Sequence, residues 1–592
     1  MTLAAHLNTL ESTGLVHLAQ TLPELEYLFR HALIQDAAYR SLVKADRRAL
    51  HRAVGEMLER AYPDRIDELA PLLARHFDEA GDDDRALKYF TRAGDVAART
   101  YANAEAAQHY ARALDLARQV PDAAHLQLVH LCVSYGSVLR LNGRFDLALA
   151  HYVESERLAQ SRGDRALELA VLMERATIHS TPTPVQNRAL GQQLLERALS
   201  LARELSDPTA EARIYWNLML GELFGGSTHE AVGYGEQSLA LAREHDLREQ
   251  LAFTLSDLSF AYVFVGEIQR GRAALSEVRA VWQSLGNLPM LADNLSNSAL
   301  TSFYVGEHGE ALRFGEEALR LSRSIGNKWG QSHALGMMGY ALQETGQMGE
   351  ALAAWESSVE LGAQAGLVAT QIGIRADLAW LYGSLGVLER ALELARLALA
   401  TSEKILPIWS PWASAVQARL LLLAGHLDEA EQVAQSGCPG RIQDYFTRLL
   451  MTGAVAVTLV RGELALARRR PEPAVTLAND LAEHLQSIGA RTFVSDALHL
   501  KARALQVMGQ VDAAAAVLAE ARAYAEAIGS RRSVWPILSA LSEIASQRGR
   551  PAEADELRGQ ARVVVNFIAD HLTAAEIRTS FLNLPDVRRV AF

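Results

Sequence analysis

Apolar and small residues return at helical spacing along most of the chain. Between Gly306 and Arg323 this stripe is complete, and Gly326 follows it as a glycine suited to a left-handed helix end. The residues of the stripe are Ala311, Leu312, Ala318, Leu319 and Leu321. We find no sustained alternation of β-branched and polar residues bounded by turn residues. The pattern therefore predicts an all-α fold.

The helical stripes form a repeat of 40 residues. A glycine separates the two stripes of each period, and a second glycine ends the second stripe. The separating glycines are Gly226, Gly266, Gly306, Gly346 and Gly386, and Gly509 and Gly549 repeat the spacing. Each period thus holds two helices joined by a short turn. Stacked hairpins of this kind predict a right-handed α-solenoid.

Small and large residues alternate where the two helices of a period should cross. Gly339 in the first helix is followed by Ala351, Trp355 and Ser358 in the second. Two closely crossing helices need a small residue at the contact and a bulky neighbour beside it. The arrangement resembles the tetratricopeptide signature, and two earlier sets match it: Ala86, Phe90 and Ala93, then Ala148, Tyr152 and Ser155. The resemblance covers about residues 80 to 592, and the 40-residue unit is closer to the longer-helix variant of large bacterial signalling proteins.

The first 62 residues do not fit the period. The run from Phe29 to Tyr39, FRHALIQDAAY, resembles the end of the winged-helix region in bacterial signal-transduction ATPases of the STAND type. That group includes ATPase-linked adenylate cyclases and MalT-like regulators, which carry a C-terminal tetratricopeptide arm. The resemblance implies that the chain is the arm and hinge of a larger machine. Two origins of such a chain stay open: separation from the larger protein by gene splitting, and a reading frame that begins at an internal start.

Three regions follow from the repeat and the resemblance. We expect a winged-helix-like remnant or hinge at residues 1–62, the first helical hairpins at 63–120 and the repeat solenoid at 121–592. Prolines weaken the period at three places, because proline breaks helices. These places are Thr181 to Pro184, Pro407 to Trp412, and Pro439-Gly440.

Charge and cysteine usage narrow the classes of partner. The formal net charge of −12 argues against nucleic acid as the main partner, because that binding needs clustered lysine and arginine. Cys132 and Cys438 stand far apart without cysteine or histidine neighbours, so they predict neither a disulfide framework nor a zinc site. No apolar stretch approaches the roughly 20 residues of a membrane helix. We therefore expect a cytoplasmic protein that does not enter membranes.

Motifs that carry catalysis are missing from the sequence. There is no GxxxxGK[ST] loop to hold nucleotide phosphates, and no HExxH, GxSxG or EF-hand pattern in a credible setting. We accordingly predict no enzyme activity, no catalytic or metal-binding residues and no cofactor.

The candidate binding residues lie on the first helices of successive repeats. Alignment on the 40-residue phase gives one row with aromatic residues, one with short polar residues and a partial third. The rows are Phe260, Leu300, Tyr340 and Trp380; Asp257, Asn297, Met337 and Asp377; and Asp293 with His333. Ring faces and short polar groups can together grip a peptide or another extended ligand. The alternative is that the rows pack helix against helix, but buried aspartates then need partners or a groove open to water.

These observations favour a non-enzymatic interaction and sensing scaffold, the regulatory arm of a signal-transduction ATPase or a transcriptional regulator. A protein or peptide segment would bind the concave face, with a small-molecule inducer as a further candidate, and residues 1–62 would dock a separate ATPase or effector module. One alternative is a truncated part of an ATP-hydrolysing or adenylate-cyclase enzyme. The other is a DNA-binding regulator that acts through residues 1–62, whose basic residues are Arg30, Lys44, Arg47, Arg48 and Arg52.

Overall fold

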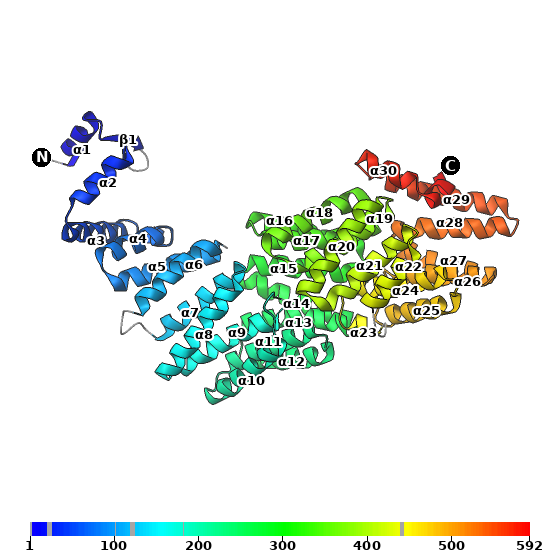
Figure 1. Ribbon diagram of the computed structural model, residues 1–592, viewed down its shortest axis with the longest axis horizontal. Coiled ribbons are helices and arrows are strands. Elements are labelled where there is room, and N and C mark those ends of the chain that lie inside the picture. Colours follow the sequence, from blue (N-terminus) through cyan, green and yellow to red (C-terminus); the bar gives the residue numbers. More distant parts are fainter. Residues whose placement is uncertain are drawn as a thin grey trace. The chain divides into compact units, whose positions relative to one another are not determined.

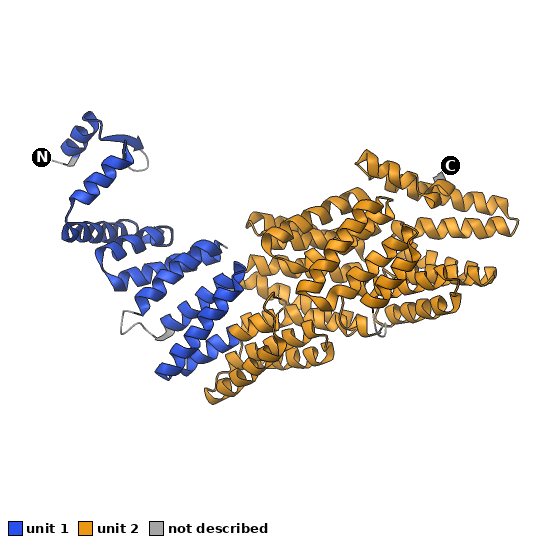
Figure 2. Ribbon diagram, in the orientation of Figure 1, with its two compact units in different colours: residues 1–174 blue, residues 175–592 orange. Residues whose placement is uncertain are grey.

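The computed structural model describes residues 3–20, 26–100, 102–118, 125–181, 183–438 and 443–591. Nearly all of them are helical, which confirms the predicted all-α fold. The chain forms two compact units, residues 1–174 and 175–592, shown in blue and orange in Figure 2. The predicted division after residue 62 falls between a long helix and a short 3-10 turn. The one after residue 120 lies outside the described residues, as do Pro182, Pro439 and Gly440.

The first unit starts with a helix and a β-hairpin and continues as helical hairpins (Figure 1). Its elements are α1 (Leu3–Ser12), β1 (Val16–Gln20), β2 (Glu26–Phe29), α2 (Ala32–Ser41), α3 (Lys44–Ala61), η1 (Pro63–Arg65), α4 (Ile66–Ala80), α5 (Asp83–Arg99), α6 (Asn103–Ala117), α7 (His125–Leu141), α8 (Phe145–Arg162) and the start of α9 (Arg165–Ser180).

A short β-hairpin is the exception to the helical fold in the described residues. β1 and β2 pair antiparallel with Val16 opposite Phe29, and the register shifts between Leu18 and Gln20. The two strands have five and four residues, and Val16 is their one buried residue among those described. A hairpin this short and exposed shows no apolar alternation, which is why the sequence pattern did not reveal it.

The second unit consists of helical hairpins in chain order. Its elements are α10 (Arg188–Glu204), α11 (Pro208–Gly225), α12 (Thr228–Glu244), α13 (Arg248–Phe264), α14 (Ile268–Leu285), α15 (Leu288–Tyr304), α16 (His308–Ser324), α17 (Lys328–Glu344), α18 (Met348–Ala365), the π-helical turn η2 (Thr370–Ile374), α19 (Arg375–Ser384), α20 (Leu388–Ile405), η3 (Pro407–Trp409), α21 (Ser410–Leu423), α22 (Leu427–Gly437), α23 (Gln443–Phe446), α24 (Met451–Ala467), α25 (Pro471–Ser487), α26 (Val494–Val507), α27 (Val511–Ala527), α28 (Arg531–Gln547), α29 (Pro551–Asp570), α30 (Ala575–Leu582) and α31 (Pro585–Ala591).

The turns of the hairpins confirm the predicted glycine spacing. Gly306 has φ +86°, and its N–H donates to the carbonyl oxygen of Phe303 at 3.0 Å, which closes the end of α15. Gly326 then ends α16 with φ +66°. Asn327 caps the next helix, because its Oδ1 accepts from the N–H of Gly330 at 3.1 Å. Each period is therefore one hairpin with a defined start and end.

The small residues lie where the helices cross, as the tetratricopeptide resemblance implies. A Cβ on Gly339 would lie 2.2 Å from Nε1 of Trp355, so the bare backbone makes room for that buried ring. Trp355 donates its indole N–H to the carbonyl oxygen of Gly336 at 2.9 Å. The same fit recurs in the first unit, where Gly136 lies against Tyr152.

The second unit also closes on itself, which the sequence did not predict. The turns after α11, α13, α15 and α17 contact residues much later in the chain, along a line that we call the seam. The facing pairs are Gly226 with Arg448, Gly266 with Ile488, Gly306 with Ile528, and Gly346 with Ile568, each 222 positions apart. Backbone hydrogen bonds join the two sides, from Arg491 N to Tyr304 O at 2.9 Å and from Gly349 N to His571 O at 3.1 Å.

Candidate ligand-binding site

The candidate residues lie on one helix of each of four successive repeats. Asp257 and Phe260 come from α13, Asp293 and Asn297 from α15, His333 and Tyr340 from α17, and Asp377 and Trp380 from α19. The first six line one cavity of about 290 Å³, which we call the aromatic cavity. Asp377 and Trp380 line a neighbouring cavity of about 310 Å³, the charged cavity, and Tyr340 lines both. The structure therefore places all eight on cavity walls but divides them between two cavities.

Another part of the aromatic cavity's wall comes from residues that no sequence pattern singled out. Trp409 and Trp412 lie around the start of α21, and Arg448 lies just before α24. The π-helical turn η2 adds Gly373, whose missing side chain makes room for Trp412. Two tryptophans at a proline-interrupted repeat were a usable sequence signal, but nothing in the sequence placed them in one cavity with residues of α13 and α15.

The polar groups of the aromatic cavity form two small networks. In the first, Nδ1 of His333 lies 2.9 Å from Oδ1 of Asp293, and Nδ2 of Asn297 donates to Oδ2 of Asp293 at 3.1 Å. In the second, the indole N–H of Trp216 donates to Oδ2 of Asp257 at 2.8 Å. Burial raises the pKa of Asp257 to about 7, because few groups here stabilise a negative charge.

Tyr340 and Asp377 join the two cavities. The hydroxyl of Tyr340 donates to Oδ2 of Asp377 at 2.7 Å, and the indole N–H of Trp412 donates to Oδ1 at 3.1 Å. Burial raises the pKa of Asp377 to about 7 despite these two donors. The ring of Tyr340 also packs on Phe303 and Trp355. Tyr340 thus holds the helices together as well as lining the walls.

Trp380 is already covered by a charged side chain. The guanidinium of Arg419 lies 3.6 Å from the centre of the Trp380 ring, close enough for a cation–π interaction. Nε and Nη2 of Arg419 each donate to a carboxylate oxygen of Glu463 at 2.9 Å. The ring and its cover therefore form one fixed unit at the wall of the charged cavity.

A buried ion cluster closes the charged cavity at the seam. Arg532 donates to Glu344 at 2.5 Å and to both oxygens of Asp496 at 2.8 and 2.7 Å. Ser530 also donates to Glu344. Burial raises the pKa of Glu344, whereas Arg532 keeps the pKa of Asp496 low despite burial. No sequence pattern pointed to this cluster, because Glu344 and Arg532 are 188 residues apart.

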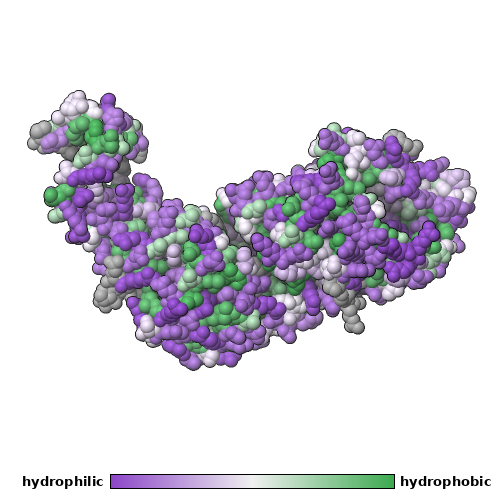
Figure 3. Space-filling model, in the orientation of Figure 1, coloured by the Kyte–Doolittle hydropathy of each residue, from purple (hydrophilic) through white to green (hydrophobic). Residues whose placement is uncertain are grey.

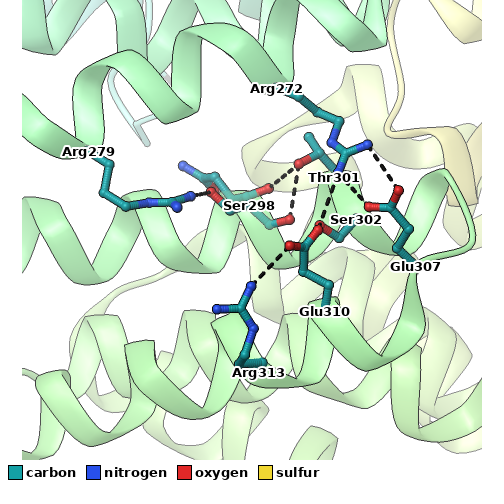
Figure 4. Close-up of polar contacts among 9 residues, drawn as sticks. Arg272, Arg279, Ser298, Thr301, Ser302, Glu307, Glu310 and Arg313 are labelled. Atoms are coloured by element: carbon teal, nitrogen blue, oxygen red, sulfur yellow. Dashed lines mark hydrogen bonds and ion pairs between the residues drawn. The ribbon is translucent and has the colours of Figure 1, made fainter.

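Another side of α15 is occupied by contacts to its neighbouring helices. Figure 4 shows Arg272 and Arg313 on Glu310, and Arg279 on Ser298, which link α14, α15 and α16. The distance from Nη2 of Arg279 to Oγ of Ser298 is 2.7 Å. These polar residues serve packing between repeats, unlike those that line the aromatic cavity.

The part of the chain that is described contains no candidate metal site and no helix that could span a membrane. None of those residues form a group of three or more histidine, cysteine or acidic side chains that could hold a metal ion. No described helix is long and apolar enough to cross a membrane. Cys132 and Cys438 are both buried thiols.

The stacked hairpins with small residues at their crossings define a helical-repeat scaffold of the tetratricopeptide class. The model of one family within that class, the MalT-like TPR region, matches residues 222–533, which is more than half of the chain. The chain belongs to this family.

Similarities to individual proteins are more distant. Human G-protein-signaling modulator 1 is 32% identical over 88 residues, which cover 15% of this chain and 11% of that protein. The chain thus spans about a tenth of that relative's length.

The chain is also similar, at low identity, to several solved structures. The Cut9–Hcn1 hetero-tetramer of APC/C is 13% identical, covering 92% of this chain and 98% of that one with a TM-score of 0.48. A Rap protein complexed with Competence and Sporulation Factor is 12% identical, covering 72% and 99% with a TM-score of 0.40. A STAND protein with a tetratricopeptide repeat sensor from Pyrococcus horikoshii is 14% identical, covering 72% and 60% with a TM-score of 0.42.

Proposed function

We propose that this chain is a non-enzymatic sensing and interaction scaffold, the regulatory arm of a signal-transduction ATPase or transcriptional regulator. The observation that carries the proposal is the aromatic cavity, which the candidate residues of three successive repeats line together. Its volume of about 290 Å³ lies at the lower end of small-molecule sites. A small-molecule inducer therefore fits this cavity better than a long peptide segment.

Ligand binding in this cavity would act on the whole second unit. The ligand would contact α13, α15 and α17 and also Trp409 and Arg448, which come from later repeats. Gly226 and Arg448 are also a facing pair of the seam. A ligand that binds the closed arrangement more tightly than an opened one would shift the population toward closure.

Ligand binding in the aromatic cavity can be tested by a substitution that fills the cavity with a larger side chain. Ala369 lines the aromatic cavity, so Ala369→Phe places a ring there, whereas Ala363→Phe changes an exposed position of α18 and is the matched control. We expect some compounds of a metabolite library to raise the melting temperature of the natural protein and of Ala363→Phe, but not of Ala369→Phe. If no compound stabilises the natural protein, or if all three proteins respond alike, the cavity is not a ligand site.

The partner-binding role is proposed for residues 1–62. Of the described residues in this segment, Val16 and Gly55 are the buried ones, so the segment has almost no core of its own. Large apolar side chains are exposed instead, with Leu33 at 82% and Val43 at 63%. Figure 3 shows apolar surface on this part of the chain. Exposed apolar groups of this kind mark interaction sites, and a separate ATPase or effector module is the proposed partner.

The docking role predicts which substitution removes the partner. We expect an ATPase or effector module to co-purify with the natural protein from its own cells and to be lost from the double variant Leu33→Ser, Val43→Ser. Val563→Ser is the matched control, because Val563 is 70% exposed on α29, far along the sequence. Recovery of the same proteins with all three forms would exclude residues 1–62 as the docking site.

A further inference from the structure

The side-chain oxygens left open in the aromatic cavity are acceptors, whereas the indole N–H groups of Trp329 and Trp409, which also line it, are donors. Asp257 uses Oδ2 to accept from Trp216, and its Oδ1 has no hydrogen-bond partner among the described residues. Asn297 is 2% exposed, its amide nitrogen donates to Asp293, and its Oδ1 has no partner within the described chain. Asp293, when ionised, only accepts, so His333 must donate to it through Nδ1.

The walls of the cavity also favour a positive charge. Two carboxylates, Asp257 and Asp293, are among the lining residues, which include no lysine. Arg448 is the one arginine among them, and it is exposed to solvent. Aromatic rings, including Phe260 and Trp409, supply faces that attract cations. An occupant should therefore donate hydrogen bonds, carry positive charge and present an apolar body.

We propose that the aromatic cavity binds the protonated amine of a small ligand, with the ammonium between Asp257 and Asn297 and an apolar body against Phe260 and Trp409. This inference rests on the proposed sensing function and names the chemical class of its ligand. An ammonium has three donors and no acceptor, which matches the open Oδ1 atoms of Asp257 and Asn297. A carboxylate would instead meet the carboxyl groups of Asp257 and Asp293.

The ionisation of Asp257 gives the proposed site a pH signature. Because burial raises the pKa of Asp257 to about 7, the carboxyl is largely neutral at pH 6 and largely ionised at pH 8. Asp293, His333 and Arg448 are the other charged or titratable groups that face the same cavity. Amine binding should therefore tighten by about three- to tenfold between pH 6 and pH 8.

Three probes with one apolar body and different head groups test the inference. Phenethylamine carries an ammonium, 2-phenylethanol a hydroxyl and phenylacetate a carboxylate. Isothermal titration of the full chain should show the amine binding at least about tenfold more tightly than either of the others. Asp257→Asn should weaken the amine by about tenfold and leave the alcohol unchanged. Glu316→Gln, on the exposed face of α16, is the matched control and should change neither.

The outcomes separate this inference from the proposed function. If the alcohol or phenylacetate binds as tightly as the amine, the cavity holds ligands but does not select an ammonium, and the inference is wrong while the sensing function stands. If none of the three binds, the inference is also overturned, and the comparison of Ala369→Phe with Ala363→Phe still decides whether the cavity is a ligand site.

Discussion

At the scale of single residues, the two inward-facing aspartates show how a helical repeat accommodates carboxyl groups. Asp257 and Asp377 each line a cavity and each accept a hydrogen bond from an indole N–H, from Trp216 and Trp412 respectively. Both pKa values are raised by burial to about 7. The folded chain therefore binds these protons more tightly than the unfolded chain, and its stability falls as the pH rises from about 4 to about 7.

Replacing Asp257 with asparagine should remove the part of this pH-dependent loss of stability that comes from Asp257. The asparagine side chain keeps an oxygen that can accept from Trp216 but never ionises. We expect Asp257→Asn to be more stable than the natural protein by about 1–4 kcal/mol at pH 8, with a much smaller difference at pH 4. Urea unfolding at the two pH values measures it. An equal difference in the free energy of unfolding at both pH values would mean that ionisation of the Asp257 carboxyl does not cause it.

At the scale of the helical hairpin, stability depends on contacts between backbone and ring. Gly339 gives room to Trp355, and Gly136 does the same for Tyr152. A side chain at either glycine would displace a buried aromatic ring from a close-packed contact. The glycine is thus required by packing rather than by its backbone angles.

Two glycine substitutions should have opposite effects. Gly339→Ala should lower the free energy of unfolding by about 1–3 kcal/mol, because its Cβ would overlap Trp355. Gly559→Ala should instead raise stability by about 0.5–1 kcal/mol, since a Cβ there meets nothing within 4 Å in helix α29. Thermal unfolding of both variants provides the measurement. A loss of stability in both would contradict the packing argument.

Elements with local signals were predictable, and those without them were not. The 40-residue hairpins follow from glycines and apolar spacing that recur within a short stretch, as around Gly306. The hairpin of β1 and β2 is too short for a pattern, and the π-helical turn η2 leaves the glycine spacing unchanged. The candidate residues could be placed on equivalent helix positions by the repeat phase. The rest of the cavity wall, with Trp409 and Arg448, depends on contacts between distant repeats that no local pattern encodes.

At the scale of the whole molecule, the seam distinguishes the second unit from an open solenoid. In an open solenoid each repeat contacts only its neighbours. Here Arg532 of α28 binds Glu344 at the end of α17, and the arginine is also bonded to Asp496. All three side chains are largely buried, and Arg532 forms an ion pair with both carboxylates.

Removing that arginine should therefore act over a long distance. Arg532→Ala should lower the free energy of unfolding of the second unit by about 3–5 kcal/mol, because it leaves buried charges unpaired. It should also speed amide hydrogen exchange at the end of α17. Arg548→Ala breaks a pair with the fully exposed Asp512, and we expect it to cost less than about 1 kcal/mol. If the two variants behaved alike, the seam would contribute little to stability.

The seam also constrains how the gene can change in length. Repeat arrays commonly gain or lose whole units through unequal recombination, which an open array tolerates because new neighbours resemble the old ones. Between Gly226 and Arg448 the span that completes one closure is 222 residues. Loss of a 40-residue unit from this span would leave the chain too short to return to the same turn. We therefore expect the number of repeats to be constant in this part of related proteins and to vary only outside it.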